Sequence, residues 1–109
     1  MKLEVGMYVR TKDRIVRIEK ILDGVMWDTQ GHLHFGDFIK ASHSIIDLIK
    51  VGDYVNGYKI TNICNTPRKH LVTEYRHNIN YVHFYIYEEN IKTIVTKEQF
   101  ESMAYKVSE

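Results

Sequence analysis

The chain has 109 residues, of which 44% are hydrophobic and 27% are charged, proportions that are ordinary for a soluble globular protein. Its formal net charge of +1 excludes a global electrostatic attraction to nucleic acid or to an anionic membrane. No stretch approaches the roughly 20 apolar residues of a membrane span, and the first residues lack the apolar run of a secretory signal. The single cysteine, Cys64, cannot form an internal disulfide, so we expect a cytoplasmic protein.

A short sequence motif occurs twice and gives the clearest signal of fold. Residues 3–9 read LEVGMYV and residues 49–55 read IKVGDYV. Each copy is followed by a run with apolar residues in matching places, VRIEKI at 16–21 and YKITNI at 58–63. Because a fixed glycine before an alternating run indicates a turn followed by a strand, the repetition predicts a small β domain built from two related halves.

We expect residues 1–109 to form a single β-rich domain whose halves span about 1–40 and 49–109. The first half contains Asp23-Gly24 between two apolar runs, which is a strong signal for a hairpin turn. Its alternating apolar residues predict extended segments at 7–10, 15–21, 25–29 and 32–40.

The segment between the halves, residues 41–48, is too apolar for a flexible linker, so we expect it to be packed. Ser42 or Ser44 could cap one short helical turn there. Catalysis by Ser42 and His43 is a weaker hypothesis, because sequence neighbours rarely supply the geometry of a nucleophile and its base. We therefore expect no catalytic site and no enzymatic activity.

The second half repeats the same kinds of signal and adds a helix. Asn56-Gly57 predicts a second two-residue hairpin turn. Thr96 and Gln99 match a capping box, which predicts a short helix from Lys97 to about Met103. The alternating runs predict strands at 58–64, 71–75, 80–87, 91–95 and 105–107.

Many short strands, tight turns and one short C-terminal helix predict a mainly β fold. Two architectures fit this pattern. One is a compact antiparallel SH3-like barrel, and the other is a pair of small packed sheets.

The run from residue 80 to 87 carries the sharpest candidate binding surface. Alternate side chains of a strand share a face, so the aliphatic-rich set would enter the core and the ring-bearing set would face outward. An outward aromatic face can stack a planar group such as a base. The alternative is a solvent-facing sheet surface whose tyrosines pair across strands. The ring-bearing set is Tyr81, His83, Tyr85 and Tyr87, and the inward set is Val82, Phe84 and Ile86.

Three basic residues, Arg68, Lys69 and Arg76, could neutralise the phosphates of a nucleotide bound on this face. A small barrel has little interior room for a ligand, so the pocket could lie between subunits of a homo-oligomer. No cofactor is implied. His32 and His34 could contribute two metal ligands, but no third ligand follows at a matching spacing, so we expect a pair without a metal.

Three stretches resemble small, mostly uncharacterised proteins encoded by phages and prophages of Gram-positive bacteria. They are MKLEVGMYVRTK at 1–12, KASHSIIDLIKVGDYVNG at 40–57 and IVTKEQFESM at 94–103. Phage accessory proteins of this size are often inhibitors of host immunity that act by binding. The resemblance implies that class, with no established site residues.

These observations give three hypotheses for the function. The first is a non-enzymatic phage protein that counters host defence by sequestering a nucleotide-derived immune signal. The second is a protein-binding inhibitor that covers a host nuclease or another effector with its tyrosine-rich face or an exposed strand edge. The third is a nucleic-acid-binding β-barrel, whose affinity would fall steeply with salt, although the near-zero net charge counts against it.

Overall fold

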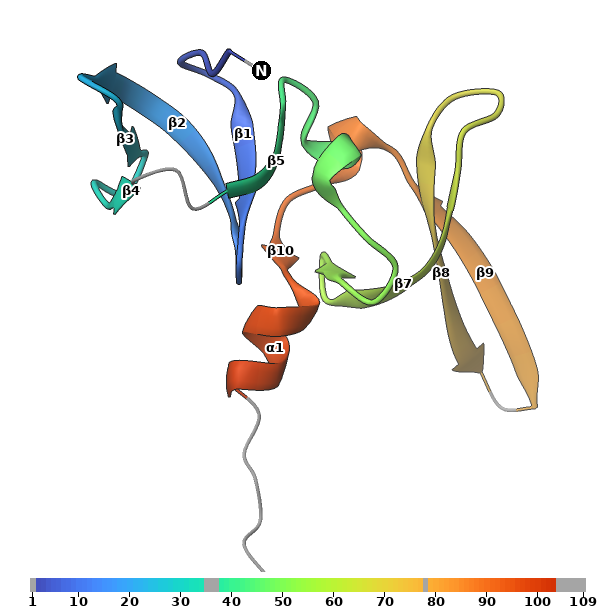
Figure 1. Ribbon diagram of the computed structural model, residues 1–109. Coiled ribbons are helices and arrows are strands. Elements are labelled where there is room, and N and C mark those ends of the chain that lie inside the picture. Colours follow the sequence, from blue (N-terminus) through green and yellow to red (C-terminus); the bar gives the residue numbers. More distant parts are fainter. Residues whose placement is uncertain (1, 35–37, 78, 104–109) are drawn as a thin grey trace, which may run out of the picture.

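The fold is seen in a computed structural model that describes residues 2–34, 38–77 and 79–103, without the side chains of residues 75–77 and 81. Strands make up 48% of the chain, and one short helix, α1 (Lys97–Met103), follows the last of them. The strands form two antiparallel five-stranded sheets (Figure 1). The expectation of a mainly β protein is confirmed, and within the described residues no closed barrel is found.

The two sheets have the same strand order. The first runs β4-β3-β2-β1-β5 and the second, read in the same sense, runs β9-β8-β7-β6-β10. Each is a four-stranded meander whose fifth strand returns to pair with the first strand. The first sheet contains β1 (Tyr8–Thr11), β2 (Ile15–Leu22), β3 (Val25–Asp28), β4 (Leu33–His34) and β5 (Phe38–Ser42). The second contains β6 (Tyr54–Val55), β7 (Tyr58–Cys64), β8 (His70–His77), β9 (Asn80–Ile86) and β10 (Ile94–Val95).

The repeated motif adopts the same hydrogen-bonded turn in both copies. The Gly6 amide donates to the Ile18 carbonyl and the Gly52 amide donates to the Ile60 carbonyl, both at 2.9 Å. In each sheet a register shift follows that isoleucine along the strand. Gly6 has φ +93° and Gly52 has φ +101°. Residues with a Cβ atom rarely adopt this left-handed conformation, whereas glycine adopts it readily. The sequence repeat is therefore a repeat of backbone geometry.

Both predicted hairpin turns are confirmed. Asp23 and Gly24 have φ values of 51° and 78°, and Asn56 and Gly57 have values of 53° and 84°. Positive φ at both central residues is the requirement of a type I′ turn, which matches the twist of the strands that it joins.

The predicted helical segments also form. A 3₁₀ turn, η1, spans Ile45–Leu48, and α1 begins after Thr96, whose hydroxyl accepts a hydrogen bond from the Gln99 amide at 3.1 Å. The cap of η1 differs from the expectation. Ser44 makes no side-chain cap, whereas the Ser42 hydroxyl accepts from the Ser44 amide and donates to Asp47, both at 3.0 Å.

The strand predicted at 91–95 is much shorter than expected. The run at 91–95 keeps only β10, because the amides of Lys92 and Thr93 donate to the Asn56 side chain at 2.7 and 3.1 Å and so leave the ladder. A second 3₁₀ turn, η2 (Glu88–Asn90), precedes this segment. The strand predicted at 105–107 lies outside the described residues.

Each sheet covers its own hydrophobic core. The two halves of the chain, which we call the first and second repeats and which contain the first and second sheets, contact each other. The first cluster contains Met7, Val9, Ile18, Met26 and Ala41, and the second contains Ile46, Ile49, Val55, Ile60, Leu71 and Ile86. Ile15 of the first repeat packs against the second cluster. No helix in the described part of the chain is long and apolar enough to cross a membrane.

Candidate ligand-binding site

The two faces of β9 differ as the alternation predicts. Ile86 is buried and Phe84 packs against the second core cluster, whereas His83 and Tyr85 are exposed, Tyr85 by 57%. Val82 departs from the expectation, since it is 39% exposed. It lies toward the tip of the β8–β9 hairpin, which reaches away from the rest of the protein (Figure 1), and so beyond the core.

The Tyr85 ring is the outer member of a series of side chains in contact, with tilted ring planes, which we call the ring column. Its centroid lies 4.8 Å from that of His70, and the His70 ring lies 5.3 Å from Tyr87. The guanidinium of Arg68 then lies 4.4 Å from the Tyr87 ring centre, within the range of a cation–π interaction. The ring column thus connects an exposed aromatic surface to a cation.

His70 holds the ring column in place, although the sequence pattern did not mark it as a stacking residue. It is buried, and its Nδ1 lies 2.8 Å from the Arg68 carbonyl oxygen. The register explains its position, because Tyr85 is paired with Val72 and His70 lies two residues earlier on the same face of β8. Only the register of β8 against β9 could have revealed this contact.

The predicted basic residues do not form one cluster. Arg68 precedes β8, whereas Arg76 lies near its other end, paired in register with Tyr81. An eight-residue strand is about 26 Å long, so a single nucleotide cannot reach both ends. The Arg76 and Tyr81 side chains lie outside the described residues.

Arg68 and Lys69 are each paired with a carboxylate. Arg68 Nη2 lies 2.7 Å from Glu89 Oε1, and Lys69 Nζ lies 2.9 Å from Asp47 Oδ1. The Lys69 hydrogen bond is the main reason that the pKa of Asp47 is lowered. Both side chains of the Arg68 pair are more than half exposed, and exposed pairs of this kind contribute only about 0–1 kcal/mol. A phosphate could therefore replace Glu89 at little cost.

These pairs border a small pocket of about 260 Å³. Its charged groups comprise three carboxylates and two cations, so its net charge is negative and becomes neutral when one carboxylate moves away. The lining residues are Ser44, Ile46, Asp47, Arg68, Lys69, Glu88 and Glu89.

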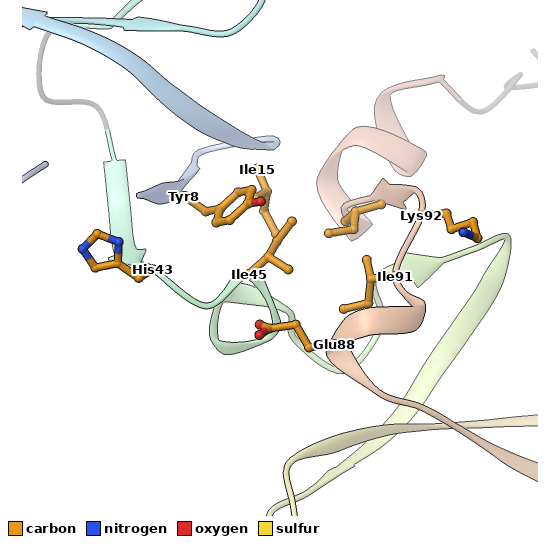
Figure 2. Close-up of a pocket in the computed structure, with 8 residues that line it drawn as sticks. Tyr8, Ile15, His43, Ile45, Glu88, Ile91 and Lys92 are labelled. Atoms are coloured by element: carbon orange, nitrogen blue, oxygen red, sulfur yellow. The ribbon is translucent and has the colours of Figure 1, made fainter. Parts of the chain in front are cut away.

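A larger cleft of about 470 Å³ lies where the two repeats meet. Figure 2 shows Tyr8 and Ile45 facing Ile91 across it, with Glu88 at one end. The Glu88 carboxylate is held there by a 3.1 Å hydrogen bond from the Ile46 amide. Of the residues that line this cleft, the sequence analysis considered His43, as part of the weaker catalytic hypothesis, and it expected the segment between the two halves to be packed. The lining residues are Tyr8, Ile15, His43, Ile45, Glu88, Ile91, Lys92 and Ile94.

The weaker candidates have structural roles in this fold. His34 Nε2 lies 3.0 Å and His32 Nδ1 lies 3.6 Å from the same oxygen of the buried Asp28. In the described ranges no group of three or more His, Cys, Asp or Glu residues is placed to hold a metal ion. Ser42 donates a hydrogen bond to Asp47, and Cys64 is free and half-buried at the end of β7.

Comparison with known proteins gives no relative: no family, no curated protein and no solved structure matches this sequence. The binding chemistry therefore has to be argued from the chain's own geometry.

Proposed function

We propose that this chain is a non-enzymatic, phage-encoded inhibitor of host antiviral defence that sequesters a nucleotide-derived signal in the cytoplasm. The observation that carries the binding part is the Tyr85 ring, which is 57% exposed and is backed by His70 at 4.8 Å. A ring held firmly on one side and open on the other is a stacking platform for a base. The biological class comes from the resemblance to phage proteins.

In this proposal the base lies against Tyr85, beside His83, and a phosphate is neutralised at the far end of the ring column. Arg68 exchanges Glu89 for the phosphate, because a guanidinium binds phosphate in a bidentate manner. Lys69 adds a second cation nearby. The same strand order in both sheets also supports the finer proposal that each repeat is an SH3-like barrel half.

Isothermal titration calorimetry with cyclic dinucleotides and ADP-ribose derivatives tests this function. One stacked base contributes about 1–3 kcal/mol, so Tyr85→Leu should weaken binding roughly 5- to 150-fold, whereas Tyr85→Phe should retain it. Phe100→Leu is the matched control, since Phe100 is 45% exposed on α1 and lies outside the ring column. No heat with any of these compounds would refute sequestration.

A second candidate function is supported by the apolar surface of the same hairpin. Ile79 is 85% exposed and Val82 is 39% exposed, and such residues favour a protein partner over solvent. In this form the hairpin covers a host nuclease or another effector. A stable complex with such a protein, together with no small-molecule binding, would favour this candidate.

A further inference from the structure

The four outer strands of the two sheets are protected to very different degrees. β4 and β10 have two residues each, and the five-residue β5 carries Lys40. Shortness and lysine are the usual means of keeping a sheet edge from pairing with another chain. β9 has seven residues, NYVHFYI, without Lys, Arg, Asp, Glu or Pro. In the part of the chain that the structure describes, no strand pairs with its outer side.

The register shows which backbone groups this edge presents. β8 and β9 pair without a shift from His77↔Asn80 to Leu71↔Ile86. A two-residue connection closes on a hydrogen-bonded pair, and in an antiparallel ladder such pairs alternate. The amides and carbonyls of Asn80, Val82, Phe84 and Ile86 therefore bond to β8. Those of Tyr81, His83 and Tyr85 point to the outer side.

The residue types of β9 are ordered symmetrically about His83. Residues 81–85 read YVHFY, which is tyrosine, an apolar residue, histidine, an apolar residue and tyrosine. When two copies pair antiparallel with His83 opposite its own counterpart, Tyr81 stands opposite Tyr85 of the partner subunit. Val82 then stands opposite Phe84 of the partner subunit. Cross-strand aromatic and apolar pairs each contribute about 0.2–1 kcal/mol, and residues 81–85 contain no Asp, Glu, Lys or Arg that would face a like charge.

We propose that a second copy of this chain pairs antiparallel along β9, with His83 on the two-fold axis. The outward backbone groups of residues 81, 83 and 85 then all find partners. The contact uses the same residues on both copies, so it closes as a dimer and leaves no further edge of this kind. The second sheet of one copy and the second sheet of the partner subunit then form one continuous sheet.

The pairing also completes the proposed binding site, a step that rests on the proposed function. Within one chain Arg76 of β8 and its cross-strand neighbour Tyr81 of β9 lie far from Arg68 along the β8–β9 hairpin. In the dimer, Tyr81 of the partner subunit stands one strand away from Tyr85, about 4.8 Å. Arg76 of the partner subunit pairs with that tyrosine and follows on the next strand. Each of the two equivalent sites is then assembled from residue positions of both chains.

The mass of the protein in solution tests the pairing without any ligand. We expect the wild type to be a dimer by sedimentation equilibrium and His83→Lys to be a monomer, because like charges would face each other across the axis. Leu33→Lys is the matched control, since Leu33 is 49% exposed on β4, the equivalent edge strand of the first sheet. It should remain a dimer.

A cysteine on the axis gives an independent measurement. In a Cys64→Ser background, His83→Cys should form an intermolecular disulfide on mild oxidation, and Leu33→Cys should form none. A monomeric wild type overturns the proposal. So does a dimer whose mass is unchanged by His83→Lys and that gives no crosslink at position 83. Because these measurements use no nucleotide, their failure is distinguishable from a failure of the calorimetric test.

Discussion

Arg10 and Asp53 form a bidentate ion pair across the two repeats. The guanidinium nitrogens lie 2.6 and 2.9 Å from the two carboxylate oxygens, and the residues are 1% and 0% exposed. Arg10 belongs to β1, and Asp53 occupies the place in the second motif that Met7 has in the first. The Leu48 carbonyl at 2.9 Å and Glu98 at 3.0 Å complete the guanidinium's contacts. The repeats are thus joined by charge as well as by apolar packing.

Removing one partner of this pair should be costly. Arg10→Met leaves the Asp53 carboxylate buried without its cation, for which about 3–5 kcal/mol is typical. Chemical denaturation measures the loss. Arg14→Met is the control, because Arg14 and Asp13 form a pair at 3.5 Å whose side chains are largely exposed, and such pairs contribute about 0–1 kcal/mol. Equal losses in the two variants would contradict the structural role of Arg10.

The same pair predicts how stability depends on pH. Burial raises the pKa of Asp53, but the hydrogen bonds from Arg10 and from the Lys50 and Lys97 amides outweigh it, so the pKa is lowered. A carboxyl with a depressed folded pKa contributes stability above its unfolded pKa, about 3.9, and loses it as pH falls through the folded pKa. The free energy of unfolding should therefore decline below about pH 4.

Asp28 and Asp47 also have lowered pKa values and should contribute to this decline. In Asp53→Asn the free energy of unfolding should be lower at neutral pH and should fall less steeply on acidification, since one titrating group has been removed. Denaturation curves from pH 7 to pH 2 provide the measurement. A variant with the same slope as the wild type would exclude Asp53 as a source of the pH dependence.

The matched turns predict matched losses at the two motif glycines. Gly6→Ala and Gly52→Ala each place a side chain at a φ near +100°, which costs roughly 1–2 kcal/mol. At Gly52 a new Cβ would also lie 3.2 Å from Lys97 Cδ, an atom midway along a flexible side chain. Thermal unfolding of the single and double variants should show additive losses. A neutral effect at either glycine would contradict the equivalence of the turns.

The start of α1 depends on the Thr96 hydroxyl. It accepts from the Gln99 amide and also donates to the Asp13 carbonyl in the turn between β1 and β2. Thr96→Ala should cost about 0.5–2 kcal/mol and reduce the helical circular dichroism signal. Thr96→Ser keeps the hydroxyl and should retain most of the stability. A loss of equal size in both variants would show that the methyl group, and not the cap, is responsible.

Much of the fold could be predicted because its signals are local. Asp23-Gly24 and Asn56-Gly57 encode their turns through positive φ, and Thr96 with Gln99 encodes the helix start. The shortening of the strand at 91–95 could not be predicted, because it depends on the side chain of Asn56, which is distant in sequence. The Asn56 side-chain amide also donates to the Asn90 carbonyl at 2.8 Å. Contacts between distant residues leave no local periodicity.

In the candidate site, too, the local features could be predicted and the contacts between distant residues could not. Alternation along β9 correctly separated exposed His83 and Tyr85 from buried Ile86. The carboxylate partners of Arg68 and Lys69 were missed, because Glu89 and Asp47 come from η2 and η1, turns that the chain brings beside β8 only on folding. The spread of the basic residues along the hairpin likewise follows from register and not from composition.

The joining of the repeats through Arg10 and Ile15 has a consequence for attempts to divide the protein. A fragment ending at residue 48 would carry a guanidinium without its counter-ion and an isoleucine without the surface that shelters it. In the complementary fragment the Asp53 carboxylate would keep its hydrogen bonds from the Lys50 and Lys97 amides but lose its cation. Although their hydrogen-bond patterns match, the two pieces are not interchangeable modules, and each supplies what the other lacks.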